Sequence, residues 1–269
     1  MNLSSLLSGW MRAPVGRAVP ADRGEPAVRS LSRTHVGHVR AINEDRVLDQ
    51  PGAGLWAIAD GMGGHAAGDL AAEIVVETLR QLAERGSPLD DAMIERALGD
   101  AGRRIHAISR QSGATSGSTV AALHIDGARG MLFWAGDSRI YRLRGRRLER
   151  LTRDHSVVQE LIDAGALLPE QAERHPDAHI ITRALGTAPG TAVERREIET
   201  AEGDLYLLCS DGLFRDGLEP DGSDLAAATL EVIADRLVER ALAAGGRDNI
   251  SLVLVAVGPS ELSKARDGG

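Results

Sequence analysis

Hydrophobic residues form a short, nearly unbroken run at residues 55–59, Leu-Trp-Ala-Ile-Ala, with glycine close to either end. A run of this length between glycines predicts a buried strand. Residues 66–84 instead repeat apolar side chains at intervals of three and four, and residues 90–110 repeat them in the same way. This spacing predicts two consecutive helices directly after the strand.

The second half of the chain returns to strand-like patterns. Segments separated by turn residues, with the spacing of an antiparallel meander, lie at 118–125, 130–135 and 139–143. A polar stretch at 152–183, with a short helix at 157–164, is expected to project as a flap or lid. Further strands are predicted at 193–199, 204–209 and 250–257, with a helix at 224–244.

Strands and helices therefore come in blocks rather than in strict alternation. Such blocks favour antiparallel sheets with helices outside them. Residues 1–29 include prolines, glycines and arginines without apolar periodicity, and predict a flexible N-terminal extension. We expect one folded domain over residues 30–258 and a disordered tail over residues 259–269.

The composition narrows the class of protein. The chain has 269 residues, 43% hydrophobic and 26% charged, and is long enough to bury a sizeable core. It contains no apolar run of membrane-spanning length, and residues 1–10 lack the features of a signal peptide. A net charge of −8 gives no broad positive field for nucleic acid. The single cysteine, Cys209, lies in an apolar run, which predicts a buried thiol and agrees with a cytoplasmic location.

One local stretch is strongly basic. Arginines stand among apolar residues at Arg139, Arg142, Arg144, Arg146, Arg147 and Arg150. The favoured interpretation is the solvated face of a hairpin that turns at Gly145. The alternative is a basic surface that docks an acidic or phosphorylated partner.

Four aspartates stand where apolar strands meet glycine-rich turns: Asp60, Asp137, Asp211 and Asp248. A small neighbour beside each carboxylate would let a cation or a phosphate approach the backbone. Converging aspartates would repel one another unless cations lay among them, and all-oxygen ligation suits Mg²⁺ or Mn²⁺. Because the sequence has no cysteine and histidine cluster with zinc spacing, a structural zinc site is not expected.

The contexts of these aspartates form five motifs in a fixed order. They are Arg40-Ala41-Ile42-Asn43-Glu44-Asp45, Asp60-Gly61-Met62-Gly63-Gly64-His65-Ala66-Ala67-Gly68, Gly136-Asp137-Ser138-Arg139, Ser210-Asp211-Gly212-Leu213 and Arg247-Asp248-Asn249-Ile250. Together, over about residues 30–258, they resemble the bacterial branch of the metal-dependent type 2C phosphatases, the PPM family. The resemblance implies a four-layer α/β/β/α sandwich, in which helices flank two antiparallel sheets and the metal centre lies at one end of the sheets.

The resemblance also implies metal ligands. Asp60 is similar to a carboxylate that bridges two metals, and Gly61 to a backbone-carbonyl ligand. Asp211 and Asp248 correspond to further ligands of the first metal. Asp137 corresponds to a ligand of a third, weaker metal shared with Asp211. Two or three Mn²⁺ or Mg²⁺ ions are therefore expected.

The resemblance also implies which motif residues bind water and phosphate. Asp45 and Glu44 resemble residues that hold metal-bound water, Arg40 resembles the cation that binds the substrate phosphate, and Asn249 supports the phosphate or its water. His65 is the only histidine within a metal motif and is the candidate general acid. In the wider family a histidine follows Asp-Gly directly, so a supporting role for His65 stays open.

The remaining candidates are assigned structural roles. His155 opens the expected flap and is interpreted as a hinge. Ser118 and Thr119 are interpreted as core-strand residues beside the site. No role is assigned to His35, His38, His106, His124, His175 and His179.

The implied activity is hydrolysis of phosphoserine and phosphothreonine in proteins by a metal-activated water. The implied partners are a bacterial serine/threonine kinase and its substrates, with the phosphatase acting as a monomer. Two alternatives keep the fold: a catalytically silent phosphatase-like regulator, and a hydrolase of small phosphate esters. A third is an interaction protein whose acidic turns merely cap strands.

Overall fold

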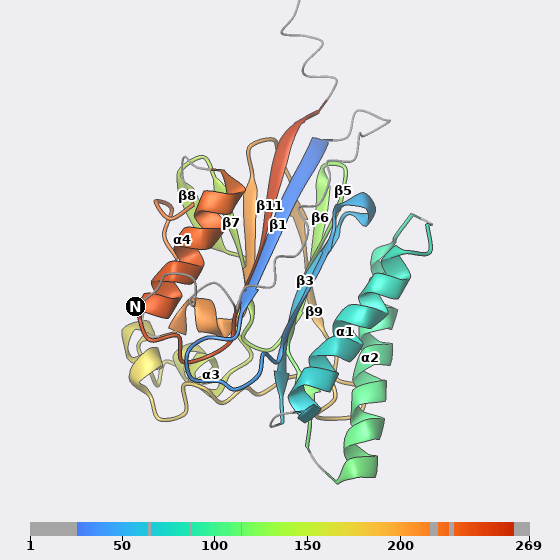
Figure 1. Ribbon diagram of the computed structural model, residues 1–269, viewed down its shortest axis with the longest axis vertical. Coiled ribbons are helices and arrows are strands. Elements are labelled where there is room, and N and C mark those ends of the chain that lie inside the picture. The colour runs from blue at the N-terminus through green and yellow to red at the C-terminus, as the bar shows by residue number, and fades with distance from the viewer. Residues whose placement is uncertain are drawn as a thin grey trace, which may run out of the picture.

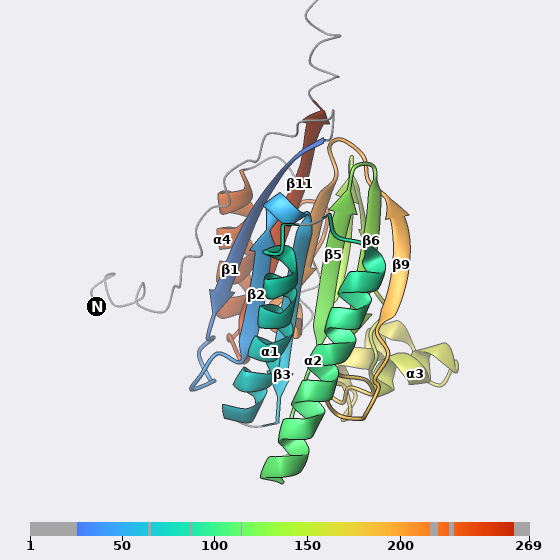
Figure 2. The same ribbon diagram turned by 90° about the vertical axis from the view of Figure 1, so that its right-hand side faces the viewer.

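The computed structural model describes residues 26–63, 66–86, 88–113, 115–215, 220–225 and 229–260. Within these residues, two antiparallel sheets face each other and helices cover both outer faces (Figures 1 and 2). Helices α1 (Ala66–Ala83) and α2 (Asp91–Ser112) lie on one side, and helix α4 (Leu230–Ala243) lies on the other. The four-layer α/β/β/α sandwich implied by the motifs is therefore confirmed.

The first sheet is built around the last strand of the chain. Its order is β1 (Pro26–His35), β11 (Ile250–Ser260), β10 (Leu205–Cys209), β7 (Arg139–Arg144) and β8 (Arg147–Arg150). Strand β11 pairs with β1 on one side and with β10 on the other, both antiparallel. The first and last described strands are thereby joined side by side.

The second sheet carries the predicted strand at residues 55–59. Its order is β2 (Asp45–Gln50), β3 (Leu55–Met62), β5 (Val120–Asp126), β6 (Arg129–Ala135) and β9 (Glu194–Glu199), with β4 (Gly117–Ser118) paired to β3. Short helical elements complete the fold: η2 (Pro51–Ala53), α3 (Val157–Asp163), η3 (Pro169–Arg174) and η4 (Asp211–Leu213).

The central strands are apolar without alternation because both of their faces are covered. Along β10, Tyr206 and Leu208 pack against the opposite sheet, whereas Leu207 and Cys209 pack under α4. Along β3, Ile58 packs between the sheets, while its neighbours on either side pack under α1 and α2. The buried thiol predicted for Cys209 is confirmed, since its side chain is fully enclosed.

The meander predicted over residues 118–143 is wrong. Strands β5 and β6 do pair with each other, but β7 pairs with β10 and β8 in the other sheet. The chain crosses from one sheet to the other at residues 136–138, between the end of β6 and the start of β7. Asp137 lies in this crossing segment, so the change of sheet determines where this predicted metal ligand is placed.

The predicted domain boundaries are also too narrow. Strand β1 begins at Pro26, and residues 26–29 pair with the end of β11, including Val28 opposite Val257. The mostly polar sequence of β1 carries no apolar alternation, and its backbone pairing with β11, together with the burial of Leu31, makes it a strand. Residues 259 and 260 likewise belong to β11 rather than to a tail. The rest of the predicted extension and tail lies outside the described residues.

The helix predicted over residues 224–244 begins later than expected. Helix α4 begins at Leu230, where the Thr229 side chain accepts a hydrogen bond from the backbone N–H of Val232 at 3.5 Å. Before it, the Asp221 side chain accepts a hydrogen bond from the backbone N–H of Ser223 at 2.6 Å, and Asp224 N–H donates to Asp221 C=O at 3.2 Å. Asp224, where the helix was predicted to begin, therefore lies in a turn.

The polar stretch at residues 152–183 lies outside both sheets and contains α3 and η3 (Figure 1). Its two ends are held together because Val157 N–H donates to Ile180 C=O at 2.9 Å and Thr182 N–H donates to His155 C=O at 2.8 Å. We refer to residues 152–183 as the flap.

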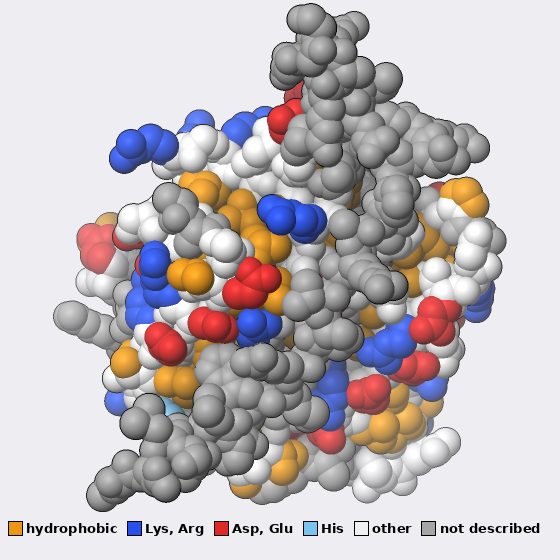
Figure 3. All heavy atoms as spheres, turned by 45° about the horizontal axis from the view of Figure 1, so that its top comes forward, with side chains coloured by type: hydrophobic (Ala, Val, Ile, Leu, Met, Phe, Trp, Pro, Cys, Tyr) orange, Lys and Arg blue, Asp and Glu red, His pale blue; other side chains and the backbone are white. Residues whose placement is uncertain are grey.

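The surface carries charges of both signs. On the face shown in Figure 3, the described acidic and basic side chains are interspersed rather than gathered by sign. Of the helices in the described part of the chain, none has the length and apolar character needed to cross a membrane.

Candidate active site

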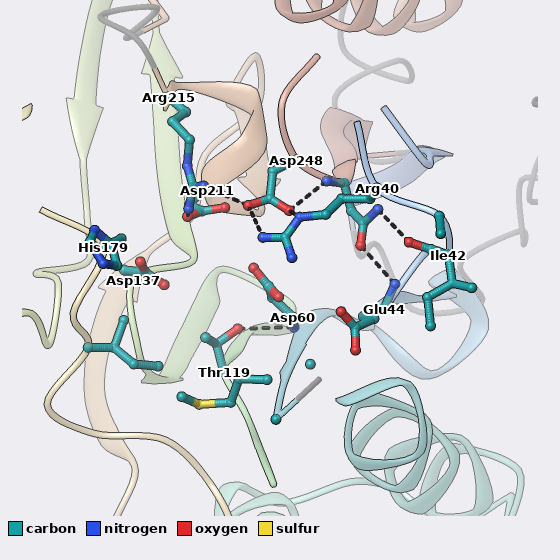
Figure 4. A pocket seen from close by; sticks show the side chains of 16 residues that line it. Arg40, Ile42, Glu44, Asp60, Thr119, Asp137, His179, Asp211, Arg215 and Asp248 are labelled. Atoms are coloured by element: carbon teal, nitrogen blue, oxygen red, sulfur yellow. Dashed lines mark hydrogen bonds and ion pairs between the residues drawn. The ribbon is translucent and has the colours of Figure 1, made fainter. Parts of the chain in front are cut away.

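A cleft of about 400 Å³ opens at one end of the two sheets (Figure 4). Most of the predicted site residues line it: Arg40, Glu44, Asp60, Gly61, Asp137, Asp211, Asp248 and Asn249. We call this hollow the acidic cleft. Asp45 lies behind it, and the candidate acid His65 lies outside the described residues.

The strand topology explains why aspartates from distant motifs meet. Asp211 follows the end of β10 and Asp248 precedes the start of β11, and these two strands are antiparallel neighbours. The start of β7 pairs with the end of β10, which places Asp137 at the same edge. Asp60 lies toward the end of β3 in the facing sheet. Each carboxylate therefore reaches the same end of the sandwich from a different element.

Glycines in the motifs permit close backbone contacts. A Cβ atom on Gly212 would lie 2.0 Å from the backbone oxygen of Asn249, which brings the Asp211 and Asp248 loops into direct contact. A Cβ atom on Gly61 would lie 2.1 Å from the backbone oxygen of Gly68 at the start of α1. Any side chain at either position would push the loops apart.

Asp45 is buried directly opposite Asp60 in the β2–β3 pair. Its Oδ2 atom accepts a hydrogen bond from the Ser210 hydroxyl at 2.7 Å. Its Oδ1 atom is buried and has no hydrogen-bond partner among the described residues, and the same is true of Oδ1 of Asp211. Buried carboxylate oxygens without partners are costly unless a cation compensates them.

The carboxyl groups of the cleft have raised pKa values. Burial, with the charge of Asp211 adding to the shift, raises the pKa of Asp45 to about 7 and that of Asp137 to about 8. Burial likewise raises the pKa of Asp60 well above its usual range, with Asp45, Asp211 and Asp137 adding to the shift. For Asp211, burial raises the pKa while the neighbouring Arg215 opposes the rise.

Two arginines lie against the acids. The Arg40 guanidinium contacts Asp248 through Nε to Oδ1 at 2.8 Å and Nη2 to Oδ2 at 2.9 Å. Arg215 donates from Nη1 to Oδ2 of Asp248 at 2.6 Å and from Nη2 to Oδ2 of Asp211. The sequence analysis missed Arg215, although its position four residues after Asp211 places both side chains on one turn.

The residues present fit divalent cations. Among the described residues, no three acidic, histidine or cysteine side chains are already gathered around one point, and guanidinium groups lie against Asp211 and Asp248 instead. The donor set is nevertheless all oxygen, it includes buried oxygens without partners, and burial, with mutual repulsion added, raises its carboxyl pKa values. These are the properties of a site for Mg²⁺ or Mn²⁺.

Asn249 holds the backbone rather than facing a ligand. Its Oδ1 atom accepts from Glu44 N–H at 2.8 Å, and its Nδ2 atom donates to the carbonyls of Val36 at 2.9 Å and Ile42 at 3.0 Å. Both amide hydrogens are therefore used, which leaves none for the phosphate contact expected from the motif. Asn249 ties the Arg40–Glu44 loop to the start of β11.

Thr119 contributes more than core packing. Its side chain lines the acidic cleft, and its Oγ1 atom accepts a hydrogen bond from the backbone N–H of Asp60 at 3.0 Å. Thr119 N–H in turn donates to the Asp60 carbonyl at 2.8 Å. These two bonds fix the backbone that carries the Asp60 carboxylate.

Two histidines of the flap have different positions. His155 accepts a hydrogen bond from Gly136 N–H at 3.1 Å through Nδ1, contacts Glu194 at 2.8 Å through Nε2, and stacks on Trp134. It therefore anchors the crossing segment beside Asp137, as a structural residue would. His179, to which the sequence analysis gave no role, lines the acidic cleft.

The arginine-rich hairpin is partly neutralised. Strands β7 and β8 pair around Gly145 as predicted, and Arg142 lies 2.9 Å from Glu149. Arg139 and Arg144 contact Asp154 at 2.6 Å and Asp204 at 2.7 Å. These pairs offset three of the six arginine charges of the hairpin, which weakens the case for a basic docking surface.

In the absence of divalent metal, we expect the melting temperature to fall between about pH 4 and about pH 8. The folded-state pKa values of about 7 for Asp45 and about 8 for Asp137 lie above the unfolded value of 3.8. Their contribution is therefore fully present below about pH 4 and is lost as these carboxyls ionise. Melts with chelator should show a smaller fall for Asp137→Asn, whereas Asp126→Asn, at the exposed end of β5, should match the wild type. Equal slopes for all three proteins would refute the proposed repulsion.

Asn249→Ala should lower the free energy of unfolding by roughly 2–4 kcal/mol, because it leaves three backbone groups without their partner. Urea denaturation measures this change. Gln81→Ala removes an amide from an exposed position and should cost less than about 0.5 kcal/mol. Unchanged stability of Asn249→Ala with a raised KM would instead support the phosphate role.

Comparison with known proteins agrees with the motif resemblance. A family model described as Protein phosphatase 2C matches residues 34–245. The serine/threonine protein phosphatase PstP of Mycobacterium tuberculosis is 39% identical over 240 residues, which are 86% of this chain but 45% of PstP. The chain thus spans less than half the length of that relative.

Solved structures give the same result. PppA of Pseudomonas aeruginosa, described as a key regulatory component of T6SS, has a TM-score of 0.77 at 39% identity and covers 86% of this chain and 97% of its own. The catalytic domain of PstP in complex with two manganese ions has a TM-score of 0.77 at 36% identity, with 86% and 98% covered. With its sandwich fold, its acidic cleft and a family match over most of its length, this chain belongs to the protein phosphatase 2C family.

Proposed function

We propose that this chain hydrolyses phosphoserine and phosphothreonine in proteins, using divalent cations held in the acidic cleft. One observation carries the proposal: Asp60, Asp137, Asp211 and Asp248, from separate elements of both sheets, converge with Arg40 on a single cleft. Carboxylates placed this close need cations, and the cations and the arginine together suit a phosphate monoester. The relative PstP, named a serine/threonine phosphatase, was solved with two manganese ions.

Asp60, Asp211 and Asp248 and the backbone carbonyl of Gly61 would hold the principal ions, and Asp137 with Asp211 a further one. When bound, Mn²⁺ or Mg²⁺ acidifies a water molecule and neutralises phosphate charge. The protein contributes rigid placement. Thr119 fixes the Asp60 backbone through two hydrogen bonds, and the close contact at Gly212 fixes the separation of the Asp211 and Asp248 loops.

Arg40 is proposed to bind the substrate phosphate. Its side chain is 47% exposed at the cleft, and Asp248 contacts only its Nε and Nη2 atoms. A guanidinium has five N–H donors in a fork that matches two phosphate oxygens. Asp248 would orient this fork toward the cleft.

Asp45 is proposed to act from behind the cleft. The Ser210 hydroxyl donates to Asp45 and accepts from Ser251 N–H at 3.0 Å, which links β2 to the ends of β10 and β11. This network would hold the loop that carries Asp211 against the strand that carries Asp60. Asp45 and Glu44 would also orient water in the cleft.

The proposed activity also implies a cellular role. The activity would oppose a bacterial serine/threonine kinase by acting on its substrates, as a monomer in the cytoplasm. The predicted carboxylates are all present and lie together, which favours turnover over a silent regulator. His65 is proposed as the general acid, and the same activity assays test it.

The purified chain should release phosphate from a phosphothreonine peptide and from para-nitrophenyl phosphate with Mn²⁺ or Mg²⁺, and should release none with chelator. Asp60→Asn should lower the rate at least about a hundredfold, because it removes a charge at the centre of the cleft. The exposed Asp126→Asn variant is the matched control and should retain full activity. Release that is independent of metal, or normal rates for Asp60→Asn, would overturn the proposed site.

Arg40→Ala should raise the KM for para-nitrophenyl phosphate about tenfold, since a charge-assisted contact with phosphate is lost, and should change kcat less. Because Arg40 also contacts Asp248, the rates are measured at saturating Mn²⁺. Arg40→Lys keeps the charge without the fork and should fall between Arg40→Ala and the wild type. An unchanged KM in both variants would exclude Arg40 from phosphate binding.

A further inference from the structure

A second hollow, of about 340 Å³, lies between the flap and the body of the protein. Its apolar lining comes from Val158 of α3, from Ala172 and Ala178 of the flap, and from Phe214 after η4. We call it the flap hollow. It shares part of its wall with the acidic cleft, including His179 and Arg215, so the two hollows are continuous.

The floor of the flap hollow contains a matched charge pair, Arg139 with Asp154, and the wall also includes the carboxylates of Asp137 and Asp211. The Arg139 guanidinium lies 3.6 Å from the centre of the Phe214 ring. Its Nε and Nη2 atoms donate to Oδ2 of Asp154 at 3.0 and 2.6 Å. The side chain of Asp154 is only 8% exposed. This charge pair is therefore already matched inside the wall, and what Phe214 and Val158 add to the surface is apolar.

Apolar side chains also stand around the acidic cleft itself. Ile42 lines the cleft and is 38% exposed, and Figure 4 shows it beside Glu44. Ile181 of the flap lines the cleft as well. Large apolar side chains that gather around a charged cleft mark a surface that another molecule covers.

Building on the proposed phosphatase function, we propose that the flap hollow is a substrate subsite that takes an apolar side chain flanking the phosphorylated residue. Successive residues of an extended peptide lie about 3.3–3.6 Å apart, so a neighbour of a residue bound in the cleft reaches a hollow that shares its wall. A leucine or methionine side chain there would gain burial against Phe214 and Val158. A glutamate side chain would lose its water, would find Arg139 and Arg215 already paired, and would meet the carboxylates of Asp137 and Asp211.

Paired phosphothreonine peptides test the subsite. Each pair differs at one position near the phosphothreonine, which carries either leucine or glutamate, and the positions on both sides are varied in turn. With Mn²⁺ present, we expect kcat/KM to favour leucine by about tenfold at one or two positions. Equal kcat/KM values at all positions, in an enzyme that hydrolyses both peptides, overturn the subsite but leave the proposed function intact.

Variants locate the preference in the flap hollow. Ala178→Phe fills the hollow and should reduce the leucine preference toward equality, whereas Ala166→Phe places the same side chain on an exposed part of the flap and should keep it. Ala172→Lys introduces a positive charge and should shift the preference toward glutamate. A leucine preference unchanged in both Ala178→Phe and Ala172→Lys, with melting curves that show folded proteins, overturns the assignment.

Para-nitrophenyl phosphate separates failure of this inference from failure of the function itself. It has no flanking residue and reports only the wild-type metal-dependent chemistry. Absence of release from this ester and from every peptide would overturn the phosphatase proposal, and the subsite with it. Release from the ester together with equal rates for all peptide pairs would overturn the subsite alone.

Discussion

Mutual repulsion among buried carboxylates is the constraint on which this structure depends. Asp45, Asp60, Asp137 and Asp211 are drawn into one region, where burial and neighbouring charges raise the pKa of each carboxyl group. Gathering such groups in a fold without compensating charges would lower its stability. The sandwich tolerates them because guanidinium groups, and the divalent cations proposed here, can balance their charge.

Hydrogen bonds to the backbone hold these acidic residues in place. The three hydrogen bonds of Asn249 fasten one loop, and the two bonds between Thr119 and Asp60 fasten a strand. His155 fastens the segment that crosses between the sheets. All three act on backbone groups, so the positions of the carboxylates are fixed by the main chain, and their side chains remain directed at the cleft. This is the preorganisation that electrostatic catalysis requires.

Two neighbouring hollows of different character follow from this arrangement. The acidic cleft is lined by carboxylates and arginines. The flap hollow beside it shares Asp137, Asp211 and Arg215 with the cleft and adds an apolar lining. The first is proposed to take a phosphoryl group with the help of divalent cations, and the second is proposed to take part of the surrounding polypeptide. The flap contributes His179 to both hollows. This irregular segment therefore connects the proposed site of hydrolysis with the proposed substrate subsite.

The sequence alone determined the buried strand at 55–59, the two helices after it, and the aspartates of the cleft, because burial, helical spacing and glycine-rich turns are local properties. The motif resemblance added the layered fold. Only the tertiary structure decided that β7 leaves the sheet of β6 and that the polar β1 is a strand, because strand pairing joins segments far apart in the chain. It also decided that Arg215 and His179 reach the cleft and that Asn249 holds backbone. A side chain's partners depend on which distant loop lies beside it, and no local pattern records that.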